Sequence, residues 1–299
     1  MHVIDVTGES NTLATDLLQS LPEQTILSPR YWPHSFFIAV SFFALLVSFG
    51  SPRAAAQSYR VLYSFSGPDG ASTNAGLVTD ASGNLFGTTP QGGAKNAGTV
   101  FELVNSSGSY SYKLLYSFTA GNDGGYPFAG LILDAAGNLY GTTLGGGALD
   151  TGTVFELVNS SGTYSEKVLY SFGESGENDG LSAQSGLVMD ASGNLYGTTT
   201  EGGIFLGPTC ASSDGCGIVF ELVNSSGTYT EKVLYSFTGS SGDGATPSGL
   251  VMDASGNLYG TTTQAGASGS GTAPLTRQRW VAAQRVVMAY LRHPSPRLV

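Results

Sequence analysis

The chain has little of the residue type that most often carries catalysis. Its three histidines, His2, His34 and His293, stand near the two ends of the 299 residues. That distribution removes histidine bases, Ser-His-Asp triads and histidine metal ligands from the long middle part. Serine is common there, but none is accompanied by a plausible base, so the sequence predicts no catalytic residue.

Charge is also scarce, and it is mostly of one sign. Only 11% of the residues are charged, and the formal net charge is −10. Between Gln57 and Thr272, five basic residues stand against eighteen acidic ones, a net charge of −13. Because such a surface repels phosphate backbones, we expect no nucleic-acid partner. The negative charge does not exclude cationic ligands, divalent ions or neutral glycans as partners.

The sequence lacks the run of about 20 apolar residues that a membrane-spanning helix needs. Its longest run, from Phe36 to Gly50, has the length of a signal-peptide core, and the alanines at 54–56 supply a cleavage site. We therefore interpret residues 1–56 as an N-terminal extension and signal peptide and expect the mature protein to be extracytoplasmic, either secreted or on the cell surface. The first 34 residues are acidic, which indicates a true start downstream of Met1. An uncleaved signal anchor, which would hold the protein in the membrane, is the alternative.

Glycine, in contrast, is abundant, with 43 residues, and it marks a repeat. The motif GNLYGTT and close variants recur at intervals of 54, 56 and 63 residues. A short apolar segment ending in aspartate precedes each copy. The first three copies are followed by GTVFELVNSSG or its variant GIVFELVNSSG, and then by a segment ending in LYSF. The four motifs begin at Gly83, Gly137, Gly193 and Gly256. Agreement this close indicates tandem structural repeats.

Each repeat is predicted to form four antiparallel strands, a to d, joined by short turns. In the third repeat, strand a spans Gly186 to Asp190 and strand b spans Asn194 to Thr199, where Gly197 lets an aromatic ring or backbone approach closely. In the second repeat, alternating residues over 154–158 and 168–172 predict strands c and d. Four-stranded repeats without helical periodicity are typical of β-propeller blades. We predict an all-β, propeller-like array of about four blades over residues 57–272, with an open stack of β-units as the alternative.

The runs GLVMDASGNLYGTTTEGG and GIVFELVNSSGTYTEKVLYSF resemble the bacterial GloVer-type tandem repeat. The resemblance covers residues 58 to 265. It implies an exported protein with an extracytoplasmic or cell-surface location, and it brings no established activity and no catalytic residues. Relatives often end in a surface-sorting signal, and the present sequence shows none.

The predicted array is incomplete at both ends. A lone strand d from Tyr59 to Phe65 comes first, and the fourth repeat has strands a and b, with strand c expected near Gly271. A ring of four blades closes only if the lone strand completes the last blade. An open ring would expose strand edges and favour self-association.

Residues 273–299 form an aberrant basic tail. Five arginines and no glycine occur in these last 27 residues, which indicates a frameshift product. The alternative is a basic amphipathic helix that could bind anionic lipid. Its apolar face would carry Trp280, Ala283, Val287 and Leu291.

The repeated aspartates form two sets. The first set, predicted to cap the a–b turns, is Asp80, Asp134, Asp190 and Asp253. The second set lies in Asp-Gly turns before strand a, and its members are candidate Ca²⁺ ligands if a propeller brings them together near its axis. These are Asp69, Asp123, Asp179 and Asp243. No other cofactor is predicted, and the acidic segment from Glu174 to Asp179 is interpreted as a solvated loop.

Other repeated side chains are assigned to packing. The strand-c glutamates Glu102, Glu156 and Glu221 are too far apart in successive blades to form a catalytic pair for glycoside hydrolysis. The aromatic residues Phe86, Tyr140, Tyr196 and Tyr259 share one strand-b position, which favours packing between blades. Tyr126, in a loop, departs from that pattern.

Cys210 and Cys216 are the two cysteines, and both lie in an insertion of the third repeat. In an exported protein they are expected to form a disulfide, with metal binding as the alternative. Because the insertion occurs in one repeat only, it is a place to look for individual function. We expect a non-enzymatic module for binding or scaffolding, with glycans or cell-envelope components as partners. A carbohydrate-active hydrolase or lyase on a propeller face is the alternative.

Overall fold

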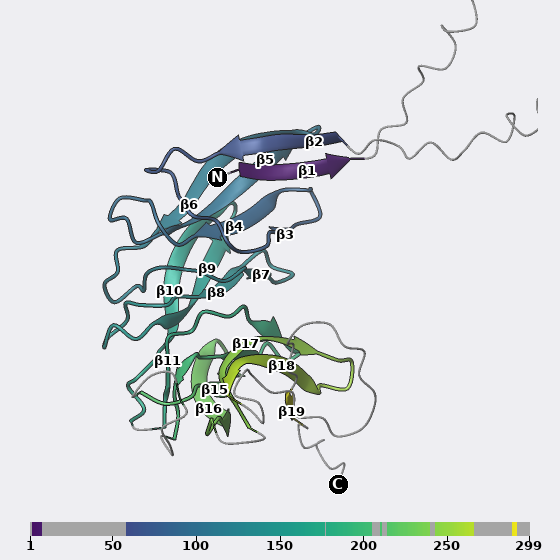
Figure 1. Cartoon of the computed structure of the whole chain (residues 1–299). Helices are drawn as coiled ribbons and strands as arrows, with labels where there is room; N and C mark the ends of the chain where they lie inside the picture. The colour runs from purple at the N-terminus through teal and green to yellow at the C-terminus, as the bar shows by residue number, and fades with distance from the viewer. Residues whose placement is uncertain are drawn as a thin grey trace, which may run out of the picture. The chain divides into compact units, whose positions relative to one another are not determined.

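The computed structural model describes residues 2–7, 58–176, 178–204, 210, 214–239, 243–265 and 289–291. Every regular element in these ranges is a β-strand (Figure 1). The described ranges contain no helix of the length and apolar character that crossing a membrane requires. Two compact units divide the chain, residues 3–62 and a larger unit that contains the repeats.

Three four-stranded antiparallel sheets follow one another, one for each complete repeat. The first contains β3 (Val78–Thr79), β4 (Leu85–Thr89), β5 (Thr99–Ser106) and β6 (Ser109–Ser117). The second contains β7 (Ile132–Leu133), β8 (Leu139–Thr142), β9 (Thr153–Ser160) and β10 (Thr163–Ser171). The third contains β12 (Val188–Met189), β13 (Leu195–Thr198), β15 (Ile218–Ser225) and β16 (Thr228–Ser236). Strands pair in the order a to d, which confirms the all-β, propeller-like fold.

The remaining strands form smaller sheets. β11 (Gly180–Leu181) pairs with β14 (Glu201–Gly202), and β1 (His2–Thr7) pairs with β2 (Ser58–Ser64). β2 is the predicted lone strand d. Among the described residues its sheet contains β1 as the other strand, so closure of a ring through β2 stays a prediction.

The fourth repeat contains β17 (Gly244–Met252), β18 (Leu258–Ala265) and β19 (Ala289–Leu291). β19 lies beside β18 in the place of a strand c, with Leu291 opposite Leu258. The helix considered for the tail is therefore wrong over residues 289–291. The rest of the tail, the expected strand c near Gly271 and the apolar run from Phe36 to Gly50 lie outside the described residues.

A layer of phenylalanines connects successive repeats. The ring that ends strand d packs edge-on against the strand-c ring of the next repeat. The ring centroids lie 5.0 Å apart for Phe65–Phe101, 5.1 Å for Phe118–Phe155 and 5.2 Å for Phe172–Phe220. A strand-b glycine makes room for each strand-c ring, since a Cβ at Gly197 would lie 2.5 Å from Phe220 Cζ. The predicted close approach at this glycine is confirmed, and it keeps the layer continuous.

Candidate functional site

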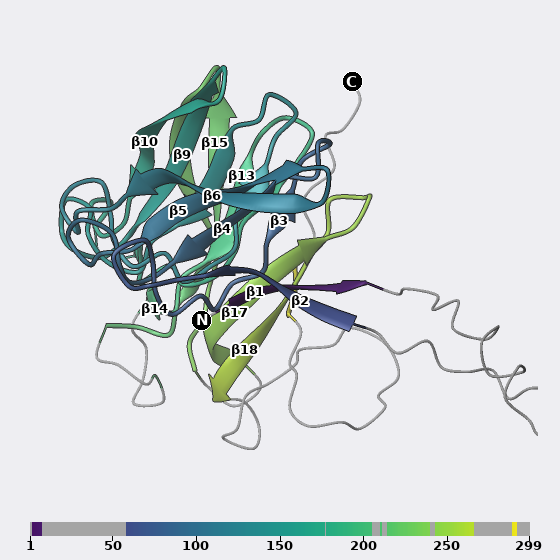
Figure 2. The same ribbon diagram turned by 90° about the horizontal axis from the view of Figure 1, so that it is seen from above.

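The antiparallel order of each blade places its connections at two opposite ends. The a–b and c–d turns share one end, called here the turn end, where Asn105 of the c–d turn donates its N–H to Asn84 Oδ1 at 2.8 Å. The b–c and d–a loops share the other, called here the loop end, where Ala71 pairs with Gln91. The hairpin of β5 and β6 is one of the long pairs that run between these ends (Figure 2).

The turn end has nearly the same sequence in every repeat, and its carboxylates hold the turns. Asp134 Oδ1 accepts the N–H groups of Ala136 and Asn138, both within 2.9 Å. The other three aspartates of this set accept the equivalent bonds. Burial alone would raise the pKa of Asp190, but the hydrogen bonds that it accepts from Asn194 lower it below its usual range. The predicted capping role is therefore confirmed.

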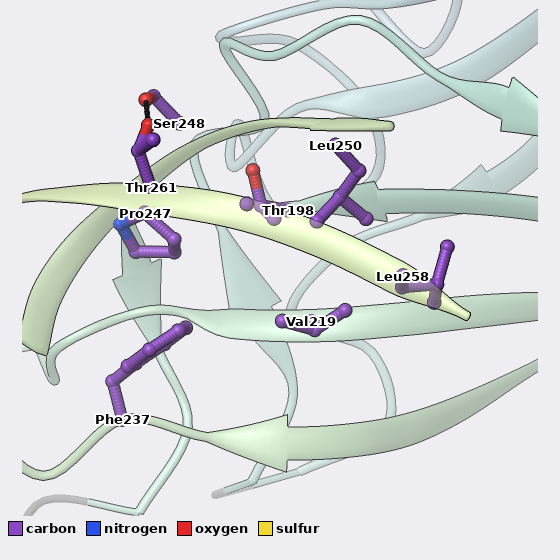
Figure 3. A pocket seen from close by; sticks show the side chains of 9 residues that line it. Thr198, Val219, Phe237, Pro247, Ser248, Leu250, Leu258 and Thr261 are labelled. Atoms are coloured by element: carbon purple, nitrogen blue, oxygen red, sulfur yellow. Dashed lines mark hydrogen bonds between the residues drawn. The ribbon is translucent and has the colours of Figure 1, made fainter. Parts of the chain in front are cut away.

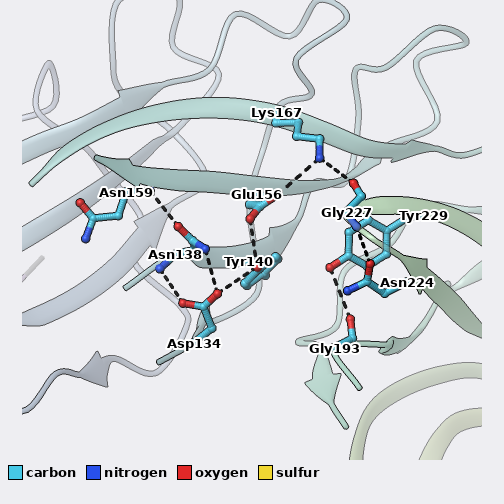
Figure 4. Close-up of polar contacts among 10 residues, drawn as sticks. All are labelled: Asp134, Asn138, Tyr140, Glu156, Asn159, Lys167, Gly193, Asn224, Gly227 and Tyr229. Atoms are coloured by element: carbon cyan, nitrogen blue, oxygen red, sulfur yellow. Dashed lines mark hydrogen bonds and ion pairs between the residues drawn. The ribbon is translucent and has the colours of Figure 1, made fainter. Parts of the chain in front are cut away.

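A polar chain joins this end to the neighbouring repeat (Figure 4). The Tyr140 hydroxyl lies 3.1 Å from Asp134 Oδ2 and 2.9 Å from Glu156 Oε1. Lys167 Nζ lies 3.8 Å from Glu156 and donates to Gly227 O of the next repeat at 2.8 Å. The strand-c glutamates thus belong to ion pairs with strand-d lysines. Two of these lysines, Lys113 and Lys167, also donate to a glycine carbonyl of the next repeat.

The four candidate Ca²⁺ ligands hold loops instead of meeting. Each accepts a hydrogen bond from the tyrosine of a YSF motif; Tyr116 donates to Asp123 at 3.0 Å and Tyr170 donates to Asp179 at 2.8 Å, with Asp69 and Asp243 bonded in the same way to Tyr63 and Tyr235. Backbone N–H groups occupy further oxygen positions. No three Asp, Glu, His or Cys side chains gather into a metal-binding group in the described ranges.

The segment from Glu174 to Asp179 is only partly the solvated loop that was expected. Glu174 is exposed, but Asp179 is 3% exposed. Hydrogen bonds from the N–H groups of Ser175 and Gly180 and from the hydroxyl of Tyr170 compensate the Asp179 carboxylate for the water that it loses on burial. The interpretation as a solvated loop is wrong for Asp179.

Two hollows lie between the third and fourth repeats. The first is an apolar pocket lined by Val219, Phe237, Pro247 and Leu258 (Figure 3). Its free volume of about 10 Å³ admits no more than a water molecule, so it is a packing defect between the repeats and is too small for a ligand. The second is an open groove of about 480 Å³ at the turn end, where the bordering aspartates are those that cap the turns.

The two cysteines form a disulfide, with 4.9 Å between their Cα atoms. Cys216 is buried, and its carbonyl oxygen accepts the N–H of Thr246 from the next repeat at 2.9 Å. Residues 205–209 and 211–213 of the insertion lie outside the described ranges.

The loop end has a strained backbone position that sequence reasoning missed. This position comes three residues after each of the four candidate Ca²⁺ ligands, and its φ angle is between 55° and 62°. The residues that occupy it are Ser72, Tyr126, Ser182 and Thr246. Residues other than glycine rarely adopt this left-handed conformation. The N–H groups of the last three donate to the b–c loop of the preceding repeat. The constant spacing after Asp-Gly is a signal in the sequence, but the differing residue types conceal it.

Comparisons with known proteins agree with the repeat organisation. The sequence matches the model of the Gloeobacter/Verrucomicrobia repeat over residues 51–211, more than half of the chain. No curated protein matches it. Similar solved structures include a putative gluconolactonase (15% identity, TM-score 0.39, covering 66% of this chain and 61% of that one) and a gluconolactonase from Xanthomonas campestris (15%, 0.42, 71% and 61%). The chain thus spans about three fifths of the length of these two, and likeness at this level carries no activity over.

Proposed function

The chain belongs to the Gloeobacter/Verrucomicrobia repeat family, and from this premise we propose that it is an exported, non-enzymatic module that binds glycans or other cell-envelope components through its loop end. Export is supported by the apolar run from Phe36 to Gly50 and by the small residues before Gln57. The acidic composition of the repeats supports a neutral or cationic partner over an anionic one.

The observation that carries the proposal is the contrast between the two ends of the repeats. The turn end repeats one sequence, and its carboxylates are used in hydrogen bonds within the fold. The loop end differs between repeats and exposes apolar side chains: Tyr126 is 38% exposed, Leu149 is 58% exposed and Ile204 is 42% exposed. Varied loops on a rigid β scaffold are a common arrangement for recognition.

The test is retention of the full chain, produced with its own leader, on insoluble cell-wall polysaccharide. We expect Leu149→Asp to weaken retention several-fold, because it places a charge in the loop end. Ser160→Asp, at an exposed position of the turn end, is the matched control and is expected to bind normally.

Equal loss in both variants, or no retention of the wild-type chain, would contradict the proposal. Release of sugar products by the purified chain would instead favour the carbohydrate-active hydrolase or lyase. Fractionation of the source cells tests export, and a protein found only in the cytoplasm would contradict that part.

A further inference from the structure

One repeat differs from its neighbours at the strained loop-end position. In the first repeat the Ser72 hydroxyl donates to Gln91 Oε1 at 3.1 Å, and in the third Ser182 Oγ lies 3.4 Å from Glu201 Oε2. Tyr126 takes the place of the serine in the second repeat, and Gly145 takes the place of the partner. A polar pair is thus replaced by an aromatic ring beside a glycine.

The backbone that carries this ring is held on both sides. The Tyr126 N–H donates to Ala97 O of the preceding repeat at 2.7 Å, and its carbonyl accepts the N–H of Leu144 at 3.2 Å. Next to it, Gly125 and Gly145 exchange two backbone hydrogen bonds of 2.8 and 3.1 Å. Tyr126 is fixed at φ +59°, a conformation that costs a side chain of this size free energy. The same left-handed position occurs at Ser72, Ser182 and Thr246, so the scaffold fixes the backbone and the side chain is what differs in the second repeat.

Gly145 lies between two functional groups and lets both approach its backbone. A Cβ on this glycine would lie 3.5 Å from Tyr126 Cδ2 and 3.4 Å from Asp150 Oδ1. Asp150 is exposed, and its Oδ1 accepts the N–H of Gly146 at 2.8 Å. Since a carboxylate offers about four acceptor positions, Asp150 has acceptor capacity left for a ligand.

A ring face with acceptor oxygens at its edge matches the chemistry of a neutral sugar. One face of a pyranose is lined by C–H groups that can lie on the electron-rich face of an aromatic ring, and its hydroxyls donate hydrogen bonds. Recognition of an alkylammonium group uses a cage of several aromatic faces, whereas Tyr126 offers a single ring. A uronic acid would meet the carboxylate of Asp150 with like charge.

We propose that Tyr126, Gly145 and Asp150 form a subsite for a neutral pyranose at the loop end of the second repeat. This proposal rests on the proposed binding function and names its ligand class. The subsite uses the tyrosine ring as the stacking surface and the carboxylate as the hydroxyl acceptor, and Gly145 lets the two side chains lie close to each other.

The first test exchanges the subsite for the polar pair of the first repeat. The Tyr126→Ser/Gly145→Gln variant installs side chains that the same backbone carries at Ser72 and Gln91. Affinity is measured by native electrophoresis of the full chain in gels containing β-glucan, galactomannan or arabinoxylan. We expect affinity for the polysaccharide that retards the wild-type chain to fall roughly tenfold or more. Tyr59→Ser changes a tyrosine that is 69% exposed on β2 and serves as the matched control with unchanged affinity.

The second test separates binding from a structural role. Glycine tolerates positive φ, so Tyr126→Gly is expected to unfold at the same or a higher temperature than the wild type while losing polysaccharide affinity. A lower unfolding temperature with unchanged affinity would identify Tyr126 as a structural residue and overturn the subsite.

The remaining outcomes distinguish the two proposals. Retardation that survives the double exchange overturns the subsite and leaves the binding function standing. A wild-type chain that none of the three polysaccharides retards, and that is not retained on cell-wall polysaccharide, overturns both. Displacement of the bound polysaccharide by millimolar choline chloride overturns the sugar assignment in favour of a cation site.

Discussion

At the scale of single residues, Glu166 and Glu231 show how one position changes its chemistry between repeats. In the first repeat the equivalent residue is Tyr112, whose hydroxyl donates to Asp69 O at 2.6 Å and whose ring stacks on Tyr63. Each glutamate has a buried Oε1 without a hydrogen-bond partner. Burial and then a nearby aspartate raise the pKa of both glutamates to about 7, with Asp123 acting on Glu166 and Asp179 on Glu231.

These two glutamates predict a pH dependence of stability. Because their pKa is raised above the ordinary 4.5, the folded protein binds more protons than the unfolded chain between about pH 4.5 and 7. Stability is therefore highest at the acid side of that window and falls as the pH rises through it. Glu166 faces Asp123 and Tyr116 of the preceding repeat. Glu231 faces Asp179 and Tyr170 in the same way.

Urea unfolding at about pH 5 and pH 8 tests this dependence. Both side chains are partly solvated, so we expect the loss to be roughly 1 kcal/mol per glutamate. The double variant Glu166→Gln/Glu231→Gln should flatten the dependence. Glu166→Tyr, which restores the residue of the first repeat, should remove about half of it. An unchanged slope in the double variant would contradict the assignment.

At the scale of elements, the hairpins of each blade could be predicted from the sequence. The turn DASGN and the alternation of Val154 to Val158 specify local pairing, because a short turn leaves a strand only its neighbour as a partner. The pairing of β1 with β2 could not be predicted, since about 50 residues separate the two strands and no pattern relates them. β19 was missed because the tail lacks the repeat motif.

The candidate subsite was predictable only in part. Tyr126 stands out in the sequence as an aromatic residue in a loop, outside the repeated strand-b position. Its left-handed backbone does not follow from local propensity, since a tyrosine before Pro127 favours an extended conformation. The conformation is fixed by the hydrogen bond that the Tyr126 N–H donates to Ala97 O and by the one that its carbonyl accepts from the Leu144 N–H, and only the packing of two repeats brings these groups together. The role of Gly145 depends on the same packing.

The glycine of strand b provides a prediction for a single element. A Cβ at Gly141 in β8 would lie 2.6 Å from Phe155 Cζ and 2.9 Å from Leu131 Cδ2. Gly141→Ala should therefore lower the free energy of unfolding by about 1–3 kcal/mol through overpacking. Gly186→Ala is the matched control, because its nearest heavy atom would lie 3.8 Å away. Chemical denaturation of both variants decides; equal stabilities would show that the Phe155 ring can move aside.

At the scale of the whole molecule, the phenylalanine layer determines how the repeats act together. In arrays of repeats, stability is the sum of each repeat and of its contacts with its neighbours. Phe172 is fully buried and meets Phe220 of the following repeat. One substitution at Phe172 therefore removes a central part of the apolar contact between the second and third repeats.

Phe172→Ala should cost about 3–5 kcal/mol and separate unfolding into two transitions. Calorimetry would show two thermal transitions. Hydrogen exchange would show the amides of the two parts of the array losing protection at different denaturant concentrations. Leu149→Ala, which truncates an exposed side chain, is the control and should keep a single transition. A single transition in the Phe172 variant would mean that other contacts couple these repeats.

The contact between each phenylalanine and the ring of the next repeat has a consequence for how such a chain can change in length. Because each of the three complete repeats receives the preceding phenylalanine on an equivalent strand-c ring, one of these repeats can be duplicated or deleted without a new interface. Each added repeat brings one more set of loops on a fixed spacing. Duplication of the second repeat would also duplicate the proposed pyranose subsite, and two such sites on one chain would bind a polymer of neutral sugars with avidity.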